Sequence, residues 1–123
     1  MAYLHSDILD AALAYISANA ENLYICSAEP GTYAEAQTAY KLGTKASPSF
    51  GAVANGDVSG RKLPVTAIGD GTINTTGTAT HWAICDNSES KLLAAGSLSA
   101  PQIVTSGNPF SLTAFDIEIP DPD

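Results

Sequence analysis

The chain has 123 residues, of which 45% are hydrophobic and 15% are charged. This length and apolar content predict one folded domain over residues 1–123 rather than a disordered chain. Thirteen acidic residues against five basic ones give a net charge of −8, which excludes nucleic acid and anionic membranes as expected partners. The sequence contains no apolar run of the roughly 18 residues that a membrane span needs. The first residues also lack the basic region of a secretory signal, so we expect a protein that is not exported.

Residues 1–22 are predicted to form an N-terminal arm followed by a helix. Ser6 suits the N-cap position, and Asp7 and Asp10 suit the positive end of the helix dipole. Apolar residues at helical spacing predict a core-facing stripe of Ile8, Leu9, Ala12, Leu13 and Ile16. The alternative interpretation is an amphipathic arm that docks on a partner.

Residues 23–119 are predicted to form a β-rich body. After a strand at 23–27 and a short helical stretch at 33–40, turn residues separate short apolar runs roughly every ten residues. This spacing predicts a mainly β fold, an antiparallel β-sandwich or barrel-like domain with the helix packed on it. The expected strands are 50–54, 61–68, 78–85, 91–98, 102–105 and 111–119. The expected turns are Asn55-Gly56, Asp70-Gly71 and Gly107-Asn108. Residues 120–123 form an acidic tail.

Two cysteines and two histidines are the residues best suited to chemistry, and they are far apart in the sequence. We expect Cys26 and Cys85 to be buried, reduced thiols, although a disulfide stays open. So few scattered ligands do not predict a metal site. Strand alternation places His81 and Cys85 on one face, too far apart for proton transfer, and Trp82 on the other face as a core anchor. Cys26 could meet His81 only on a neighbouring strand.

Three further motifs resemble functional sites but lack the residues those sites need. Segment 56–62 departs from the phosphate-binding loop in its glycine spacing, and Asp70 is the only carboxylate of its loop, too few for calcium. Asp116 and Glu118 share a strand face, yet the chain has few aromatic residues with which to build a sugar cleft. We therefore predict no catalytic, cofactor-binding or metal-binding residue, and a protein that is not an enzyme.

A series of short motifs runs along nearly the whole chain. The motifs are DAAL (10–13), CSAEP (26–30), TYAEA (32–36), GDVSGRK (56–62), GTATHWA (77–83), SKLLA (90–94), GNPF (107–110) and FDIEI (115–119). In their order and spacing they resemble a family of small virion-associated structural proteins of tailed bacteriophages and prophages. The resemblance implies a β-rich virion protein, synthesised and assembled in the bacterial host cytoplasm, with no catalytic residues.

The resemblance also implies partners within the virion. The first expectation is a capsid decoration (cement) protein that binds the major capsid protein in many copies, as a homo-oligomer. The alternative is a neck, tail or fibre-attachment component of the same virion, with binding of a host glycan left open, and a small Cys/His-dependent enzyme is more remote. Partner contacts are expected in the N-terminal arm and at the basic pair that ends segment 56–62. The candidate contact residues are Tyr3, Leu4, His5, Arg61 and Lys62.

Overall fold

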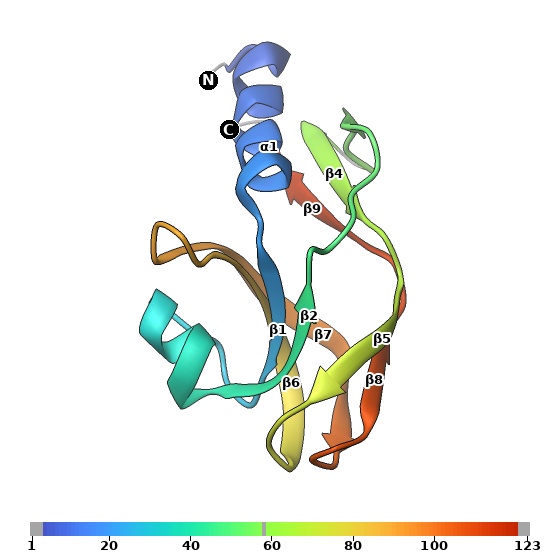
Figure 1. Ribbon diagram of the computed structural model, residues 1–123. Helices are drawn as coiled ribbons and strands as arrows, with labels where there is room; N and C mark the ends of the chain where they lie inside the picture. Colours follow the sequence, from blue (N-terminus) through green and yellow to red (C-terminus); the bar gives the residue numbers. More distant parts are fainter. Residues whose placement is uncertain (1–3, 58, 121–123) are drawn as a thin grey trace.

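The computed structural model describes residues 4–57 and 59–120, and it confirms the predicted fold class. The elements are α1 (Ser6–Asn19), β1 (Asn22–Cys26), η1 (Glu35–Ala39), β2 (Lys41–Ala46), β3 (Ala54–Asn55), β4 (Arg61–Val65), β5 (Ile68–Ile73), β6 (Gly77–Asp86), β7 (Lys91–Val104), β8 (Pro109–Leu112) and β9 (Phe115–Ile119). Six strands form a curled sheet in the order β7-β6-β1-β2-β5-β8, and the other three form a small sheet in the order β3-β4-β9. Every pairing is antiparallel. The larger sheet is a half-barrel, and α1 stands beyond one end of it, beside β4 (Figure 1).

Strand β1 and residues 82–86 of β6 lie side by side in the interior of the sheet and are buried on both faces. Leu23 and Ile25 of β1 join Trp82 and Ile84 of β6 in the main hydrophobic core. The residues between them belong to a second cluster, which η1 covers with Ala36. Burial on both faces explains why residues 23–26 of β1 and 82–85 of β6 are continuous apolar runs rather than alternating ones.

The main core fills the concave side of the half-barrel. It contains Trp82 of β6, Phe110 and Leu112 of β8, and Val65 of the small sheet. The Trp82 ring packs against Phe115 of β9, with ring centroids 4.7 Å apart. Core residues from both sheets therefore meet in one cluster, which holds the small sheet against the end of the half-barrel.

Helix α1 matches its predicted range, but its cap and its buried face differ from the prediction. His5 is the N-cap, and its Nδ1 accepts a hydrogen bond from the Asp7 backbone N–H at 3.0 Å, so Ser6 is the first helical residue. The residues of α1 and its C-cap that face the protein are Leu9, Leu13, Ile16 and Ala20. Ile8 and Ala12, predicted to face the core, are exposed.

Several strand boundaries differ from the predicted ones. The predicted turn at Asp70-Gly71 lies inside β5, because Gly71 provides space for the Phe110 ring rather than a change of direction. The predicted strand 111–119 is divided between β8 and β9, which belong to different sheets. Segments 91–98 and 102–105 form one long strand, β7, with bulges in its pairing to β6. Strand β2 was not predicted, and Phe50 forms only an isolated bridge with Val65.

We expect the two glycines of β5 to respond differently to alanine. A Cβ at Gly71 would lie 2.2 Å from the Phe110 ring, so Gly71→Ala should lower the free energy of unfolding by about 2 kcal/mol through overpacking. A Cβ at Gly69 meets nothing within 4 Å, so Gly69→Ala is the matched control and should change little. Urea unfolding of both variants measures the difference, and equal stability would contradict the packing described for Gly71.

Candidate functional site

The structure brings Cys26 and His81 together as cross-strand partners of β1 and β6, the one arrangement that could have made a Cys–His pair. Both cysteines are free thiols and are fully buried. Burial raises the pKa of the Cys26 thiol to about 12 and that of Cys85 to about 11. A nucleophilic cysteine needs a lowered pKa, so the environment of these thiols is the opposite of an activating one.

His81 is hydrogen-bonded to hydroxyl groups rather than to Cys26. Thr80 donates its hydroxyl proton to the Ser27 carbonyl at 3.0 Å, so its oxygen accepts from His81 Nδ1–H at 2.8 Å. His81 Nε2 lies 3.5 Å from the Ser97 hydroxyl oxygen. The Cys26 thiol contacts the Ala36 carbonyl oxygen instead, at 3.9 Å. The two ring nitrogens of His81 therefore lie against hydroxyl groups of the sheet rather than against a thiol.

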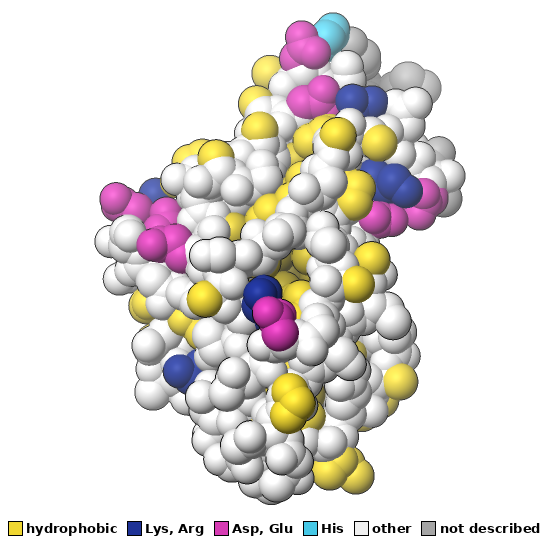
Figure 2. Space-filling model, turned by 45° about the vertical axis from the view of Figure 1, so that its right-hand side comes forward, with side chains coloured by type: hydrophobic (Ala, Val, Ile, Leu, Met, Phe, Trp, Pro, Cys, Tyr) yellow, Lys and Arg dark blue, Asp and Glu magenta, His cyan; other side chains and the backbone are white. Residues whose placement is uncertain are grey.

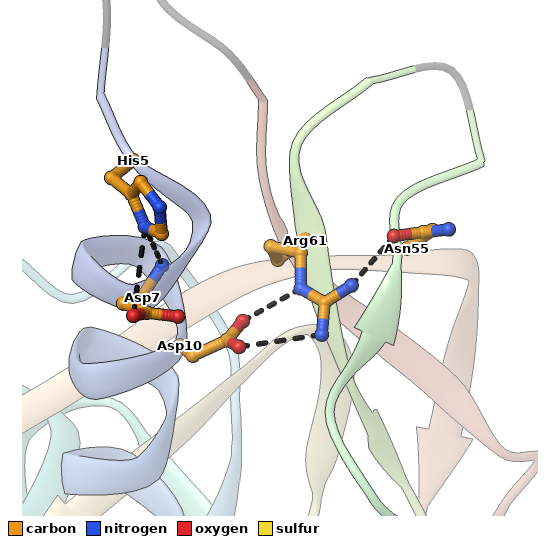
Figure 3. A network of polar contacts seen from close by, with 5 residues as sticks. All are labelled: His5, Asp7, Asp10, Asn55 and Arg61. Atoms are coloured by element: carbon orange, nitrogen blue, oxygen red, sulfur yellow. Dashed lines mark hydrogen bonds and ion pairs between the residues drawn. The ribbon is translucent and has the colours of Figure 1, made fainter.

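The two basic candidate residues are engaged within the chain. Figure 3 shows Arg61 of β4 reaching across to α1, where its Nε and Nη2 donate to the Asp10 carboxylate at 2.7 and 3.3 Å. Its Nη1 donates to Asn55 at 2.6 Å. This bidentate ion pair ties α1 to the small sheet, so Arg61 has a structural role whether or not it also contacts a partner.

Lys62 and the loop before it are held in the same way. Lys62 Nζ lies 2.8 Å from Asp57 and 3.3 Å from Asp116, and these hydrogen bonds raise the pKa of Lys62. Glu118 accepts from the Asp57 backbone N–H at 2.7 Å. Asp116 and Glu118, considered above as a carboxylate pair, therefore fix the loop that precedes β4. Lys62 and Arg61 are therefore both ion-paired within the chain and are only 23% exposed in their side chains, and a role for them in partner contact stays a prediction.

Helix α1 carries a second apolar stripe, on the side away from the core. Ile8, Ala11 and Tyr15 follow one another at spacings of three and four residues and lie on one face of the helix. Ile8 is 57% exposed and Tyr15 is 47% exposed, and Leu4 is also exposed just before the helix. Hydrophobic side chains along α1 are visible at the surface in Figure 2, with acidic side chains near its end. We call Leu4, Ile8, Ala11 and Tyr15 the outer face of α1.

A groove of about 680 Å³ opens along the seam of the half-barrel. One wall is β7, and the other is the segment from β8 into β9. Trp82, 8% exposed, and Phe115 form its floor. A Cβ at Gly96 would lie 2.7 Å from the Trp82 ring, so this glycine lets the indole pack against the β7 backbone. The groove was not predicted, because its walls, although close in the sequence, belong to the two terminal strands of the curled sheet and to β9 of the small sheet, and the strand order is not readable from local patterns.

Two of the predicted features lie in parts of the chain that the structure does not describe. Tyr3 and residues 121–123 of the acidic tail lie outside the described residues.

Within 4–57 and 59–120, no three His, Cys, Asp or Glu side chains gather as a possible metal-ion cluster. In the same part of the chain, no helix has the length and hydropathy required to cross a bilayer.

Comparison with known proteins gives no relative: no family model, no curated protein and no solved structure matches this chain.

We expect the alkaline stability of the protein to depend on its two thiols. An unfolded thiol has a pKa of about 8.5, so as pH rises above that value the unfolded chain loses thiol protons that the folded chain retains. The free energy of unfolding should therefore fall as pH rises from about 8.5 toward the folded pKa values of about 11 and 12. The double variant Cys26→Ala/Cys85→Ala should show a shallower fall in urea unfolding between pH 8 and 10.

Tyr24, whose pKa is also raised by burial, is present in both proteins and cancels in that comparison. Identical pH slopes in the two proteins would contradict the raised thiol pKa values.

We expect the Asp10–Arg61 pair to stabilise the attachment of α1. A double-mutant cycle with Asp10→Asn and Arg61→Met should give a coupling energy of about 1 kcal/mol, because the pair is bidentate and only partly exposed. The control is the Lys45–Asp70 pair, in which the Asp70 side chain is 73% exposed, and its coupling should be near zero. Urea unfolding measures both cycles, and equal coupling energies would show that Arg61 does not anchor the helix.

Proposed function

We propose that this protein is a non-enzymatic structural component of a tailed-phage virion, and in particular a capsid decoration protein. The observation that carries the proposal is the outer face of α1, an exposed apolar surface on a helix that stands away from the half-barrel. Such a surface is typical of a protein that docks on a larger partner. The order of the short motifs along the chain, which resembles that of small phage virion proteins, supports the phage particle as the partner.

The charge of the chain indicates what kind of surface would accept this helix. Residues 1–40 contain five acidic residues and no lysine or arginine. A complementary site on the major capsid protein would therefore present an apolar groove with basic residues at its rim. Docking in many equivalent copies needs only a modest affinity at each site, particularly if the protein is itself a homo-oligomer. A net charge of −8 would also keep the free protein from associating nonspecifically before assembly.

A neck, tail or fibre-attachment component is the second candidate. It is favoured by the groove over Trp82 and Phe115, since aromatic side chains beside polar ones are suited to ligand binding. The two candidates differ in how many copies a particle carries.

We expect hundreds of copies of this chain in each particle of the phage or prophage that encodes it. Quantitative mass spectrometry of purified virions against the major capsid protein measures this number. A dozen copies or fewer would replace decoration of the head with a neck, tail or fibre location. Complete absence would overturn the virion proposal.

The same particles can show whether α1 is the docking element. Ile8→Lys places a charge in the outer face of α1 and should weaken binding to particles lacking the protein by about tenfold or more. The matched control is Ile103→Lys, since Ile103 is 88% exposed on β7, away from the helix. If both variants bind as the unmodified protein does, the outer face of α1 is not the docking surface.

A further inference from the structure

We propose that the groove at the seam of the half-barrel binds a short, uncharged oligosaccharide. Two properties of the lining carry this inference. The floor is apolar while both walls carry hydrogen-bonding side chains, and no Lys, Arg or His is among the described residues that line the groove. The surface is separate from α1, so the inference does not rest on how the protein docks on a virion.

The floor of the groove offers an aromatic surface in a fixed position. Phe115 lies on this floor and is only partly buried, so part of its ring is open to a ligand. Trp82 packs against the same ring at a centroid distance of 4.7 Å, and Trp82 is itself held against the β7 backbone at Gly96. A pyranose ring has faces made of C–H groups, which bury apolar area when they pack on an aromatic side chain. The chain has few aromatic residues, but the fold places two of them at this one site.

Both walls carry neutral side chains that can donate and accept hydrogen bonds. Ser99 and Gln102 come from β7, whereas Ser111 and Thr113 come from β8 and the connection that follows it. None of these four side chains forms a hydrogen bond with the described part of the chain. Hydroxyl and amide groups suit the hydroxyl groups at the edge of a sugar ring, because both partners can donate and accept. The volume of about 680 Å³ is within the range of roughly 300–1,000 Å³ that is typical of small-ligand sites.

The charge of the lining favours a neutral ligand over a charged one. Asp116 is the only charged side chain among the described residues of the lining, and it lies 3.3 Å from Lys62. Lys62 is also paired with Asp57 at 2.8 Å, so it has no unpaired charge to offer to a phosphate, sulfate or carboxylate group. Because Lys62 partly offsets the charge of Asp116, the groove attracts a cation only weakly. The Asp116 carboxylate is still a strong acceptor for the hydroxyl groups of a neutral sugar.

The same residues indicate that the sugar is bound rather than cleaved. Hydrolysis of a glycosidic bond usually needs two carboxyl groups, one on each side of the bond. Asp116 lines the groove, whereas Glu118 accepts a hydrogen bond from the Asp57 backbone N–H and is not part of the lining. A single carboxylate is too few for this chemistry, so the oligosaccharide leaves the groove unchanged.

Isothermal titration calorimetry of the full chain with neutral hexaoses tests the inference. The probes are maltohexaose, cellohexaose and mannohexaose, and at least one should bind with a dissociation constant in the micromolar to millimolar range. Emission of the single tryptophan should change in parallel, because Trp82 lines the groove. The charged control is hexagalacturonic acid, which carries a carboxylate on every unit and should not bind. No binding of any neutral hexaose, or binding of the acid alone, would overturn the proposal.

A first pair of variants tests whether the sugar lies between the two walls. Gln102→Ala/Thr113→Ala removes one hydrogen-bonding group from each wall and should weaken binding of the hexaose by about tenfold or more. The matched control is Thr75→Ala/Thr105→Ala, which changes two exposed side chains outside the lining and should leave the affinity unchanged. Equal affinities of the two double variants would overturn the placement of the sugar in the groove.

A second pair of variants tests the role of the carboxylate. Asp116→Asn and Asp57→Asn each change one of the two carboxylates that contact Lys62, but only Asp116 lines the groove. Asp116→Asn should weaken binding by about fivefold, because a charged acceptor is replaced by a neutral one, and Asp57→Asn should bind as the unmodified protein does. The same loss in both variants would show that the ion pairs of Lys62, and not contact with the sugar, explain the effect, and would contradict the proposed role of Asp116.

A different occupant of the groove would also overturn this inference. Tryptophan emission that changes with protein concentration in the absence of sugar would indicate that a second copy of this chain covers the groove. A negative result in any of these experiments leaves the virion copy number and the α1 variants unaffected, so the two proposals can fail separately.

Discussion

The packing of one tryptophan connects most of this structure. Trp82 projects from β6 into the concave core, with the β7 backbone at Gly96 on one side and the Phe115 ring on the other. The indole ring lies between the two ends of the curled sheet and keeps them apart. Because β7 and β9 both pack on it, the small sheet is held against the half-barrel while the seam between β7 and β8 stays open. The same contact gives the groove its floor.

The two surfaces proposed for binding follow from how the core is completed. Two faces of the sheet need covering, and η1 covers the outside of β1 and β6 while the small sheet covers the concave side. Helix α1 is not needed to cover either face in full. Its inner residues reach the edge of the core, and the Asp10–Arg61 ion pair holds it beside β4, which leaves a second apolar stripe at the surface, where Lys91 contacts Tyr15. In this position α1 contributes more exposed side chains to the protein surface than buried side chains to the core.

The cysteines and His81 show how burial decides chemistry. Cys26 faces His81 on a neighbouring strand, an arrangement that in an exposed and charged setting could favour a thiolate. Here the thiols are enclosed by apolar side chains, and the ring nitrogens of His81 contact the hydroxyl groups of Thr80 and Ser97. The pairing of residues along a sheet is therefore not sufficient for reactivity, because desolvation moves the thiol pKa values upward.

Local patterns in the sequence determined the mainly β antiparallel class, the N-terminal helix, the free thiols and the alternation that places Trp82 opposite His81. These features depend on hydrophobic period and on turn residues, which act between neighbours in the chain. Only the tertiary structure decided that Gly71 lies within a strand, that residues 111–119 divide between two sheets, and that Arg61 and Lys62 are ion-paired within the chain. Each of these depends on a partner from a distant segment: Phe110 for Gly71, β5 and β4 for the divided strand, and Asp10 and Asp116 for the two basic residues. The groove also depends on the tertiary structure, although its walls are close in the sequence, because it exists only where the two terminal strands of a curled sheet approach without pairing.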